Sequence, residues 1–327
     1  MTHKNRLKNF LKSMPVEWLL SGEPFVKYRT LKDILGRDER DKEVVVIKES
    51  ILKHRLIKKI FDRQNKYGYW GVPKDIYTWW PKKGTTFWLL GMLADFGFTK
   101  VNKEIARACE YVFSTQIPDS GFGCAPPPKS YDCFTGILIE SLARLGYTQD
   151  PRLQKAYDWL LQRQRLDGGF WCKNTGQPRG PREKEPSCAF GTLCVLGALA
   201  QHPELRNGNA AKKGTEFLLK CWDNRGTIKY AGHDSQIGRG WEKLKYPFTD
   251  YRVLKYLDTL SQLQFARADS RMEAMIDMVI SKKDADGRFY AESIHKVWSD
   301  FDFGQKKVPS RWITFIVYKI IRKMLSA

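Results

Sequence analysis

The sequence has no apolar run long enough to cross a bilayer. Its more apolar stretches, such as Thr192 to Ala200, fall well short of the roughly 18 residues that a membrane-spanning helix needs. The first residues, Met1 to Lys12, carry His, Lys and Arg and lack both the apolar stretch and the small-residue cleavage site of a signal peptide. We therefore expect a protein without a transmembrane segment, located in the cytoplasm.

Cysteine is scarce, and no pair has the Cys-Xaa-Xaa-Cys spacing of a zinc knuckle. The chain contains 7 cysteines, an odd number, in a long sequence without a signal peptide. Both features disfavour a disulfide framework, because such frameworks belong to short secreted domains. The alternatives are reduced thiols and metal ligands.

Acidic residues are outnumbered by basic ones. There are 36 Asp and Glu against 56 Lys and Arg, which gives a formal net charge of +20. Such an excess attracts phosphate groups, nucleic acid or an anionic bilayer, but here it is spread along the chain without one long basic tail. The excess of Lys and Arg is explained equally well if most of these residues lie on the solvent-exposed faces of outer helices. Peripheral contact with an anionic membrane therefore stays an alternative, and nucleic-acid binding rests on the charge alone.

A short motif recurs about every 50 residues. Three segments align without gaps, with a Gln at the start, an aromatic residue six positions later and a Gly just before it: Gln64 to Trp70, Gln116 to Phe122 and Gln164 to Phe170. Weaker copies lie at Asp223 to Gly226 and Asp284 to Phe289. A Gly in the left-handed conformation ends a helix and lets the aromatic fold back onto it. The motif is therefore a structural element of a repeat architecture.

The segments around each turn have two different helical patterns. Amphipathic segments precede the turns, for example the one from Leu153 to Gln164, which Asp150 and Pro151 begin as N-cap and first helical residue. More apolar helices are predicted after the turns at Thr85 to Phe96, Asp132 to Leu145, Ser187 to Gln201, Phe248 to Leu263 and Ser310 to Leu325.

A further pair, Pro15 to Leu20 and Pro24 to Leu35, makes six pairs. We expect one all-α domain over residues 1–327 with an outer and an inner ring of helices. In it, the pair within residues 1–40 closes the ring formed by the repeats in residues 44–325.

The stretch from Gln164 to Trp171, its copies and the apolar helices that follow resemble the repeats of squalene and terpene cyclases and of protein prenyltransferase β-subunits. The similarity covers roughly Val44 to Leu325. It implies an α/α toroid of six helical hairpins, whose central cavity in that superfamily holds an isoprenoid chain.

The catalytic motifs of these families are missing. Squalene-type cyclases protonate their substrate with Asp-Xaa-Asp-Asp at the start of an inner helix, and ionising terpene synthases use Asp-Asp-Xaa-Xaa-Asp; neither occurs here. The nearest acids are Asp132 and Asp250 at inner-helix starts, which we assign as the candidate catalytic residues, and the loop pair Asp300 and Asp302. The zinc pattern Asp-Xaa-Cys of prenyltransferases is also altered, because Asp132 and Cys133 are adjacent. Whether the chain is an enzyme stays open.

Four cysteines in two neighbouring repeats form a candidate metal site. Cys124 and Cys172 each follow a Gly-aromatic turn, while Cys133 and Cys188 open the next inner helices, at equivalent positions to within one residue. Adjacent inner-helix starts lie side by side at one rim of a toroid, so the four thiols could share a tetrahedral zinc ion. An iron–sulfur cluster, ordinary buried thiols and redox or nucleophilic cysteines are the alternatives.

Aromatic and basic residues gather near the inner helices and loops. We assign ligand binding to Trp80, Trp88, Phe134, Phe190, Trp241, Tyr251, Arg252, Trp298, Arg311 and Trp312. Aromatic rings bind apolar chains, and basic groups at helix N-termini suit a phosphate head group. The aromatics are equally compatible with a wide packed core.

Three functions follow from these observations. The first is an enzyme or binding protein for an apolar, isoprenoid-like or lipid-like molecule, which the resemblance favours. The second is a non-catalytic interaction scaffold, which the missing acid motifs favour. The third, nucleic-acid binding, is favoured by the net charge only.

Overall fold

The computed structural model describes residues 2–72, 74, 82–123, 129–171, 185–228, 230 and 240–326. Within these ranges the chain is helical and forms no β-strand. Its only extended pairings there are the isolated bridges Gln116 with Phe122, Gly123 with Ser130, and Phe170 with Cys188. The all-α fold expected from the sequence is therefore confirmed.

The inner helices are apolar on most of their faces and are surrounded by other helices. In α11 every residue is buried, as a helix without a polar face requires. The inner set in the described part of the chain consists of α3 (Pro24–Arg29) with the π-helical turn Thr30–Ile34, α7 (Thr86–Asp95), α9 (Asp132–Leu142), α11 (Ala189–Leu199), α13 (Val253–Leu260) and α16 (Arg311–Leu325).

The outer helices are amphipathic and bury one stripe against the inner ones. In α10, Asp150 is the N-cap and accepts a hydrogen bond from the backbone N–H of Arg152, with Pro151 in the first helical position as expected. The outer set comprises α1 (His3–Lys12), α4 (Lys42–Lys53), α5 (Arg55–Phe61), α8 (Lys103–Phe113), α10 (Pro151–Leu161), α12 (Asn209–Asp223) and α15 (Ser270–Ile280).

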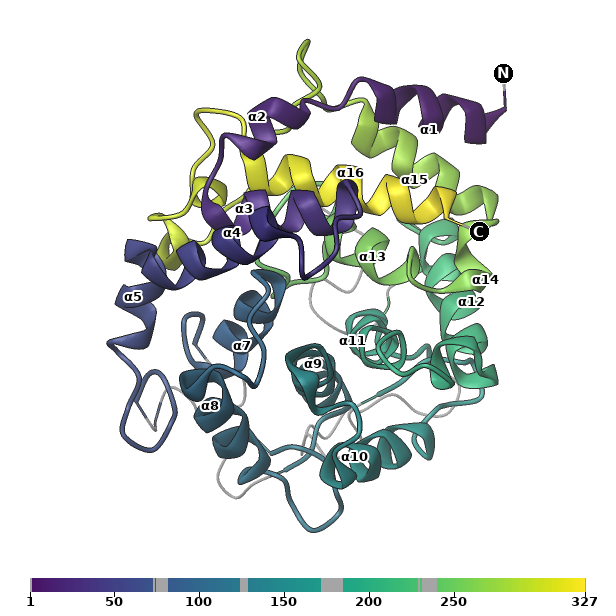
Figure 1. The fold of residues 1–327 in the computed structure, drawn as a ribbon. Coiled ribbons are helices and arrows are strands. Elements are labelled where there is room, and N and C mark those ends of the chain that lie inside the picture. Colours follow the sequence, from purple (N-terminus) through teal and green to yellow (C-terminus); the bar gives the residue numbers. More distant parts are fainter. Residues whose placement is uncertain are drawn as a thin grey trace.

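The inner helices form a closed ring. Figure 1 shows α7, α9, α11 and α13 inside the arc formed by α8, α10 and α12, with α16 and α3 crossing the remaining side. Gly136 permits the close approach of α9 and α11, because a Cβ there would lie 2.8 Å from the backbone carbonyl of Cys194. Phe25 of α3 stacks on Phe96 at 4.2 Å, and Phe96 packs edge-on to Trp312 of α16 at 5.0 Å. These contacts join the first inner helix to the second and the last, which makes an α/α toroid.

The Gln of each repeat turn binds the next repeat. The Gln164 side-chain amide donates one hydrogen bond to the carbonyl of Gly168 in its own turn and a second to the carbonyl of Ala210 in α12, both at 2.8 Å. Gln64 and Gln116 make the same two bonds in their own repeats. The Gln at the start of each of these motifs thus joins one helical pair to the next.

An inner-helix threonine fixes the register of each turn. The backbone N–H of Phe170 donates to the hydroxyl of Thr192 at 3.0 Å, and equivalent bonds join Trp70 to Thr86, Phe122 to Thr135 and Phe289 to Thr314. This register corrects one expectation. Cys188 lies four residues before Thr192, whereas Cys133 lies only two residues before Thr135, so the two cysteines are two residues apart in the repeat.

Two helix predictions differ from the structure. The outer partner of α16 is α1, whose Phe10 stacks on Tyr318 at 4.7 Å, while the segment from Pro15 to Leu20 contains only the short connecting helix α2 (Val16–Leu20). The inner helix predicted from Phe248 begins at Val253, because the preceding segment is bent and irregular, and the Val253 N–H donates a hydrogen bond to the carbonyl of Trp241.

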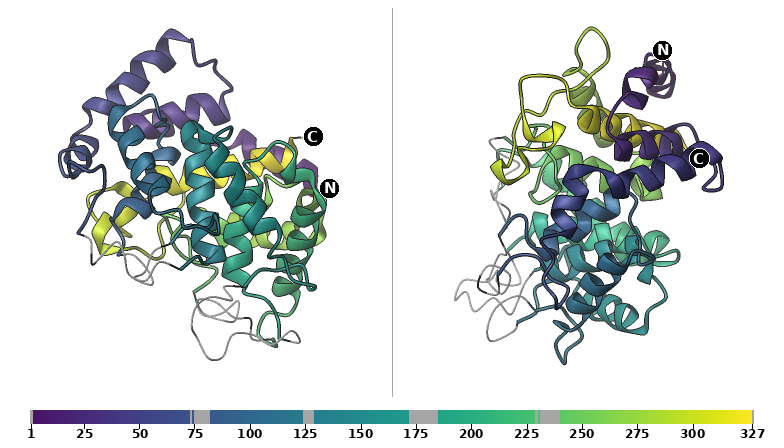
Figure 2. Two further views of the ribbon diagram at one scale, coloured as in Figure 1. Left: turned by 90° about the horizontal axis from the view of Figure 1, so that it is seen from below. Right: turned by 60° about the vertical axis from the view of Figure 1, so that its left-hand side comes forward.

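The remaining helical segments are short. They are α14 (Gln264–Arg267), the π-helical turn Ala143–Tyr147, and the 3₁₀ turns Leu205–Asn207, Lys296–Trp298 and Asp302–Gly304. Among the described residues no helix combines the length and the apolar character that crossing a membrane requires. Figure 2 shows the ring from two further directions, with both chain ends near α16.

Candidate functional site

A narrow cavity lies inside the ring, between the inner helices and the segment that precedes α13. Its volume is about 40 Å³. We call it the ring cavity; it is lined by Phe87, Trp88, Gly91, Met92, Asp95, Ile137, Glu140, Ser141, Arg144, Phe190, Cys194, Pro247, Phe248, Thr249 and Lys255. One part of this wall is aromatic and aliphatic, and the other part carries charges.

A cluster of cationic groups surrounds Asp250 beside the aromatic part of the ring cavity. Lys245 donates to one carboxylate oxygen of Asp250 at 2.7 Å and Lys83 to the other at 3.2 Å, while Nε2 of His295 lies 3.1 Å from the carboxylate. The Lys83 ammonium also lies 4.5 Å from the centre of the Trp88 ring, a cation–π distance. We call Lys83, Lys245, Asp250 and His295 the cation cluster. It contains one carboxylate for two lysines and a histidine.

The cation cluster keeps Asp250 ionised. Burial alone would raise the pKa of this carboxyl, but the hydrogen bond with His295 and the charges of Lys83 and Lys245 outweigh it and hold the pKa far below its ordinary range. Burial lowers the pKa of Lys83, and the charge of Asp250 offsets part of that shift. A carboxyl group in this state holds no proton to donate at neutral pH, and the catalytic role of Asp250 stays a prediction.

Buried ion pairs fill the charged part of the ring. Glu140 of α9 pairs with Lys255 of α13 at 2.6 Å. Asp95 of α7 pairs with Arg144 at 2.6 Å and accepts a hydrogen bond from the Tyr246 hydroxyl at 2.7 Å. Each pair joins two elements of the inner ring, so at this level the interior is polar and cross-linked.

The predicted ligand-binding residues separate into three groups. Trp88 and Phe190 line the ring cavity. Phe134, Trp241, Tyr251 and Trp312 are at most 6% exposed and pack against other rings, as Phe134 does with Phe87 and Trp312 with Phe96.

The others lie at helix starts or in the connection between α15 and α16. Arg252 donates to the carbonyl of Gly240, Arg311 donates to the carbonyl of Trp18 at 2.9 Å, and Trp298 lies between α15 and α16. Trp80 is outside the described residues.

Asp132, the other candidate acid, is fully buried at the start of α9. One of its oxygens accepts from Nε of Arg163 at 2.6 Å, and the other accepts from the backbone N–H of Trp171 at 3.1 Å. Both partners belong to the next repeat, so the carboxylate connects the first turn of α9 to the neighbouring Gly-aromatic turn.

The four cysteines are only partly placed. Cys188 is the N-cap of α11, where its Sγ accepts the backbone N–H of Gly191 at 3.1 Å, and Cys133 lies in the first turn of α9. Cys124 and Cys172 lie outside the described residues. Within the described ranges no three His, Cys, Asp or Glu side chains converge as metal ligands. The zinc site therefore stays a prediction.

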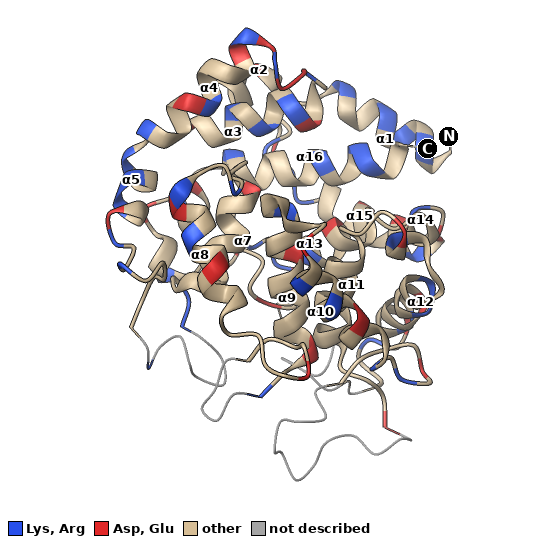
Figure 3. Cartoon of the chain, turned by 60° about the horizontal axis from the view of Figure 1, so that its bottom comes forward, with Lys and Arg blue, Asp and Glu red and all other residues tan. Residues whose placement is uncertain are grey.

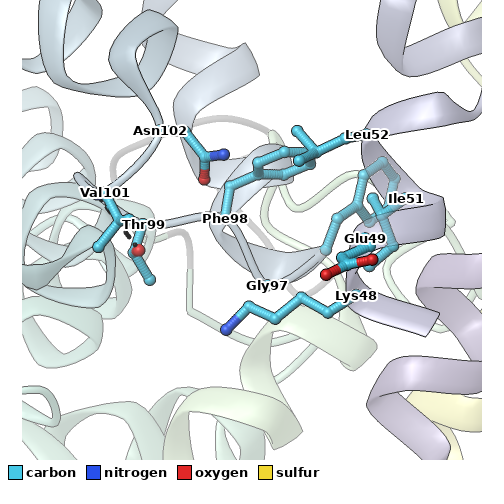
Figure 4. A pocket seen from close by; sticks show the side chains of 10 residues that line it. Lys48, Glu49, Ile51, Leu52, Gly97, Phe98, Thr99, Val101 and Asn102 are labelled. Atoms are coloured by element: carbon cyan, nitrogen blue, oxygen red, sulfur yellow. Dashed lines mark hydrogen bonds between the residues drawn. The ribbon is translucent and has the colours of Figure 1, made fainter. Parts of the chain in front are cut away.

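A hollow of about 180 Å³ lies on the outside of the ring, between α4 and the connection from α7 to α8. Figure 4 shows Lys48, Glu49 and Leu52 on one side and Phe98, Val101 and Asn102 on the other. Lys48 already pairs with Glu39 at 3.3 Å. The hollow is remote from the cation cluster and brings no set of reactive groups together.

Sequence reasoning missed the charged part of the ring. The sequence patterns described above do not indicate Lys245, Glu140, Lys255 or His295. Glu140, Lys245 and Lys255 lie in or near predicted inner helices, where a charged residue in an otherwise apolar pattern is itself a signal, because such a group must find a partner.

Comparison with known proteins agrees with this architecture. Residues 80–254 match the family described as the squalene-hopene cyclase C-terminal domain. A squalene–hopene cyclase of Bradyrhizobium diazoefficiens is 28% identical over 182 residues, which cover 54% of this chain and 25% of that protein. The β-subunit of geranylgeranyl transferase type 1 of Arabidopsis thaliana is 28% identical over 169 residues, covering 47% and 40%.

Among solved structures, a variant of a type II terpene cyclase from Scytonema in complex with geranylgeranyl dihydroxybenzoate is 12% identical and covers 99% of this chain and 97% of that one, with a TM-score of 0.46.

The closed double ring of helices, joined by Gln and Gly-aromatic turns, defines an α/α toroid of the terpene cyclase and prenyltransferase type. Since the match covers more than half of its residues, the chain belongs to the squalene-hopene cyclase C-terminal domain family. It spans about a quarter of the length of the squalene–hopene cyclase that it matches.

Proposed function

We propose that this protein binds an isoprenoid-like molecule with an anionic head group, the head at the cation cluster and the apolar chain along the aromatic wall of the ring cavity. One observation carries the proposal. Lys83 contacts both Asp250 and the ring of Trp88, so the cationic and the aromatic parts of the site meet at a single side chain. Positive groups beside an apolar wall match a molecule that is charged at one end only.

The ring cavity must widen to admit such a ligand. Its volume of about 40 Å³ lies below the roughly 300–1,000 Å³ of ordinary ligand sites. Phe248 lines the cavity from the irregular segment ahead of α13 and is only partly buried. Displacement of this side chain lengthens the cavity along Trp88 and Phe190 without breaking an inner helix.

The geometry favours binding over acid-initiated cyclisation. Asp250 is held ionised, Asp132 is paired with Arg163, and the sequence contains no Asp-Xaa-Asp-Asp. The cation cluster stabilises negative charge on a ligand, and the aromatic wall excludes water from its chain. The site described here supplies no proton donor for an alkene.

The test is the stabilisation of the protein by farnesyl diphosphate, compared with farnesol, which lacks the charge, and inorganic pyrophosphate, which lacks the chain. A ligand at 100 times its Kd adds about 2.7 kcal/mol. At ~2 °C per kcal/mol for a protein of this size, the melting temperature should rise by ~5 °C. Both fragments should act more weakly than the whole molecule.

Lys245→Gln should reduce the shift because it removes a buried cation of the cluster, whereas Lys243→Gln, at an exposed position two residues away, should leave it unchanged. Phe248→Ala should tighten binding by widening the cavity. If farnesyl diphosphate stabilises no better than pyrophosphate, or if both lysine variants respond alike, the proposal fails.

A non-catalytic scaffold is the second candidate, and the ion pairs inside the ring favour it. Glu140 with Lys255 and Asp95 with Arg144 connect inner helices through space that a long chain would otherwise occupy. A ring whose interior serves only to hold its helices together needs no ligand. Absence of stabilisation by all three compounds would support this reading.

Contact with an anionic bilayer belongs to the same proposal, because an isoprenoid ligand partitions into membranes. Figure 3 shows Lys and Arg along α1 and α5, and Lys4, Lys8 and Lys58 are exposed there. Each such group contributes roughly 1 kcal/mol to the free energy of binding to a negatively charged membrane surface. Sedimentation with phosphatidylserine vesicles, but not with phosphatidylcholine vesicles, is the expected result, and salt should abolish it.

A further inference from the structure

A second pocket lies outside the ring cavity, where the last helical pair meets the first. It has a volume of about 330 Å³, within the range of ordinary ligand sites. One face of α5 supplies Leu56, Lys59 and Ile60, and the turn that follows the helix supplies Arg63. Figure 1 shows the loop between α15 and α16 lying beside α5, and the ion pair of Lys59 with Asp300 at 2.6 Å confirms the contact. We call this the α5 pocket.

The floor of the α5 pocket is apolar. Leu56, Trp70, Leu89, Trp298 and Phe301 all line it, and each is less than 9% exposed. They come from α5, the first Gly-aromatic turn, α7 and the loop after α15. Because the segment with Trp298 and Phe301 lies more than 200 residues after the other three, the shape of this floor depends on the closed ring.

The mouth of the pocket is cationic. Lys59 and Arg63 are exposed, and Asp300 is the single carboxylate among the lining residues. The hydrogen bond and the charge of Lys59 lower the pKa of Asp300, and the neighbouring charges of Arg55 and Arg63 lower it further. Arg63 forms no ion pair with any carboxylate in the described ranges. Among the described residues, one positive charge at the mouth is therefore not neutralised by an ion pair.

The floor also contains an unsatisfied donor. Trp298 is 3% exposed, and its indole Nε1 finds no acceptor among the described residues. The other indole of the floor, Trp70, donates to the carbonyl of Ile60 at 2.7 Å. A buried N–H needs a hydrogen-bond acceptor, and here the described residues do not supply one.

We infer that the α5 pocket binds a single-chain amphiphile with an anionic head, such as a medium-chain carboxylate or alkyl phosphate, separately from the ring cavity. The chain lies on the apolar floor, and the head pairs with Arg63 at the mouth. Charge complementarity selects the sign of the head, since a cationic head would meet Lys59 and Arg63. The volume and the lining limit the site to one chain.

Titration calorimetry with decanoate below its micelle concentration tests the inference. Decanol supplies the same chain without the charge, and acetate supplies the charge without the chain. We expect decanoate to bind up to about fivefold more tightly than decanol, which is the effect of one ion pair near the surface, and acetate not to bind measurably. Decyl phosphate should bind like decanoate.

Two variants locate the site. Val297→Phe enlarges an exposed side chain that lines the pocket and should abolish binding, while Arg63→Gln should weaken decanoate about fivefold and leave decanol unchanged. Arg206→Gln is the matched control and should bind normally, because Arg206 is an exposed arginine in the 3₁₀ turn Leu205–Asn207 and does not line the pocket. Lys245→Gln should also bind normally, which separates this site from the ring cavity.

Equal affinity for decanoate and decanol, or undiminished binding by the Val297→Phe variant, would overturn the inference. Binding that disappears in Lys245→Gln would assign the ligand to the ring cavity and overturn it as well. Circular dichroism of each variant, with a melting temperature close to that of the parent, shows that a loss of binding does not reflect a loss of fold.

Discussion

The buried ion pair between Glu140 and Lys255 can be tested quantitatively. Their side chains are 9% and 5% exposed, and both carboxylate oxygens accept hydrogen bonds from Nζ of Lys255, at 2.6 and 2.7 Å. In Glu140→Leu the ammonium stays inside the ring with no other hydrogen-bonding carboxylate among the described residues. Breaking a buried pair in this way costs about 3–5 kcal/mol. At ~2 °C per kcal/mol, the melting temperature should fall by ~6–10 °C.

The double variant Glu140→Leu with Lys255→Met supplies the control. It removes both charges and keeps the side-chain volume, a change that is often neutral or stabilising for a buried pair. The free energies of unfolding of the parent, both single variants and the double variant, measured by urea denaturation, complete a double-mutant cycle. A cost below about 1 kcal/mol for Glu140→Leu, or a double variant as unstable as the single one, would refute the reasoning.

Three further predictions concern the repeat turn, the cation cluster and the cysteines. Gln164→Ala removes two hydrogen bonds and should cost about 2 kcal/mol in urea denaturation, whereas Gln149→Ala, at an exposed position, should cost almost nothing.

Asp250→Asn should destabilise the protein by a constant amount above about pH 4, the pKa of the unfolded chain. The difference in stability between the parent and the variant should shrink at lower pH. A carboxyl group whose pKa is lower in the folded than in the unfolded chain contributes stability that is lost when it is protonated. Melting curves from pH 7 to 3 measure this difference. Elemental analysis should find one zinc per chain, lost in Cys133→Ser, and a metal-free parent protein would end the four-cysteine proposal.

The repeat architecture could be predicted because its signals are local. A Gly that must adopt a positive φ, such as Gly168 at +88°, and an aromatic two residues later are visible within one short segment. The partner of Gln164, by contrast, is a carbonyl 46 residues away. Helix α1 was missed although Leu7, Phe10 and Leu11 have helical spacing, because the segment was considered only as a signal-peptide candidate.

The candidate site was harder to predict because it depends on distant pairs. Glu140 and Lys255 are separated by 115 residues, and Lys83 and Asp250 by 167. Nothing in either local sequence specifies the partner, since the contact exists only when the ring is closed. The aromatic residues illustrate the opposite error. Phe134 and Trp312 are of residue types that are common in ligand sites, but they fill space between helices. Residue type alone does not distinguish an aromatic that lines a ligand site from one that packs in the core.

The pairing of α1 with α16 has a consequence for the order of the helices. Phe10, near the start of the chain, stacks on Tyr318, near its end, so the last inner helix takes its outer partner from the opposite terminus. The arrangement in space therefore has no first pair and no last pair. A rearranged gene that places α1 after α16, through a short linker, should preserve every helix contact of the ring. Deletion of α1, in contrast, removes one of the seven outer helices named above and should weaken all six pairs together.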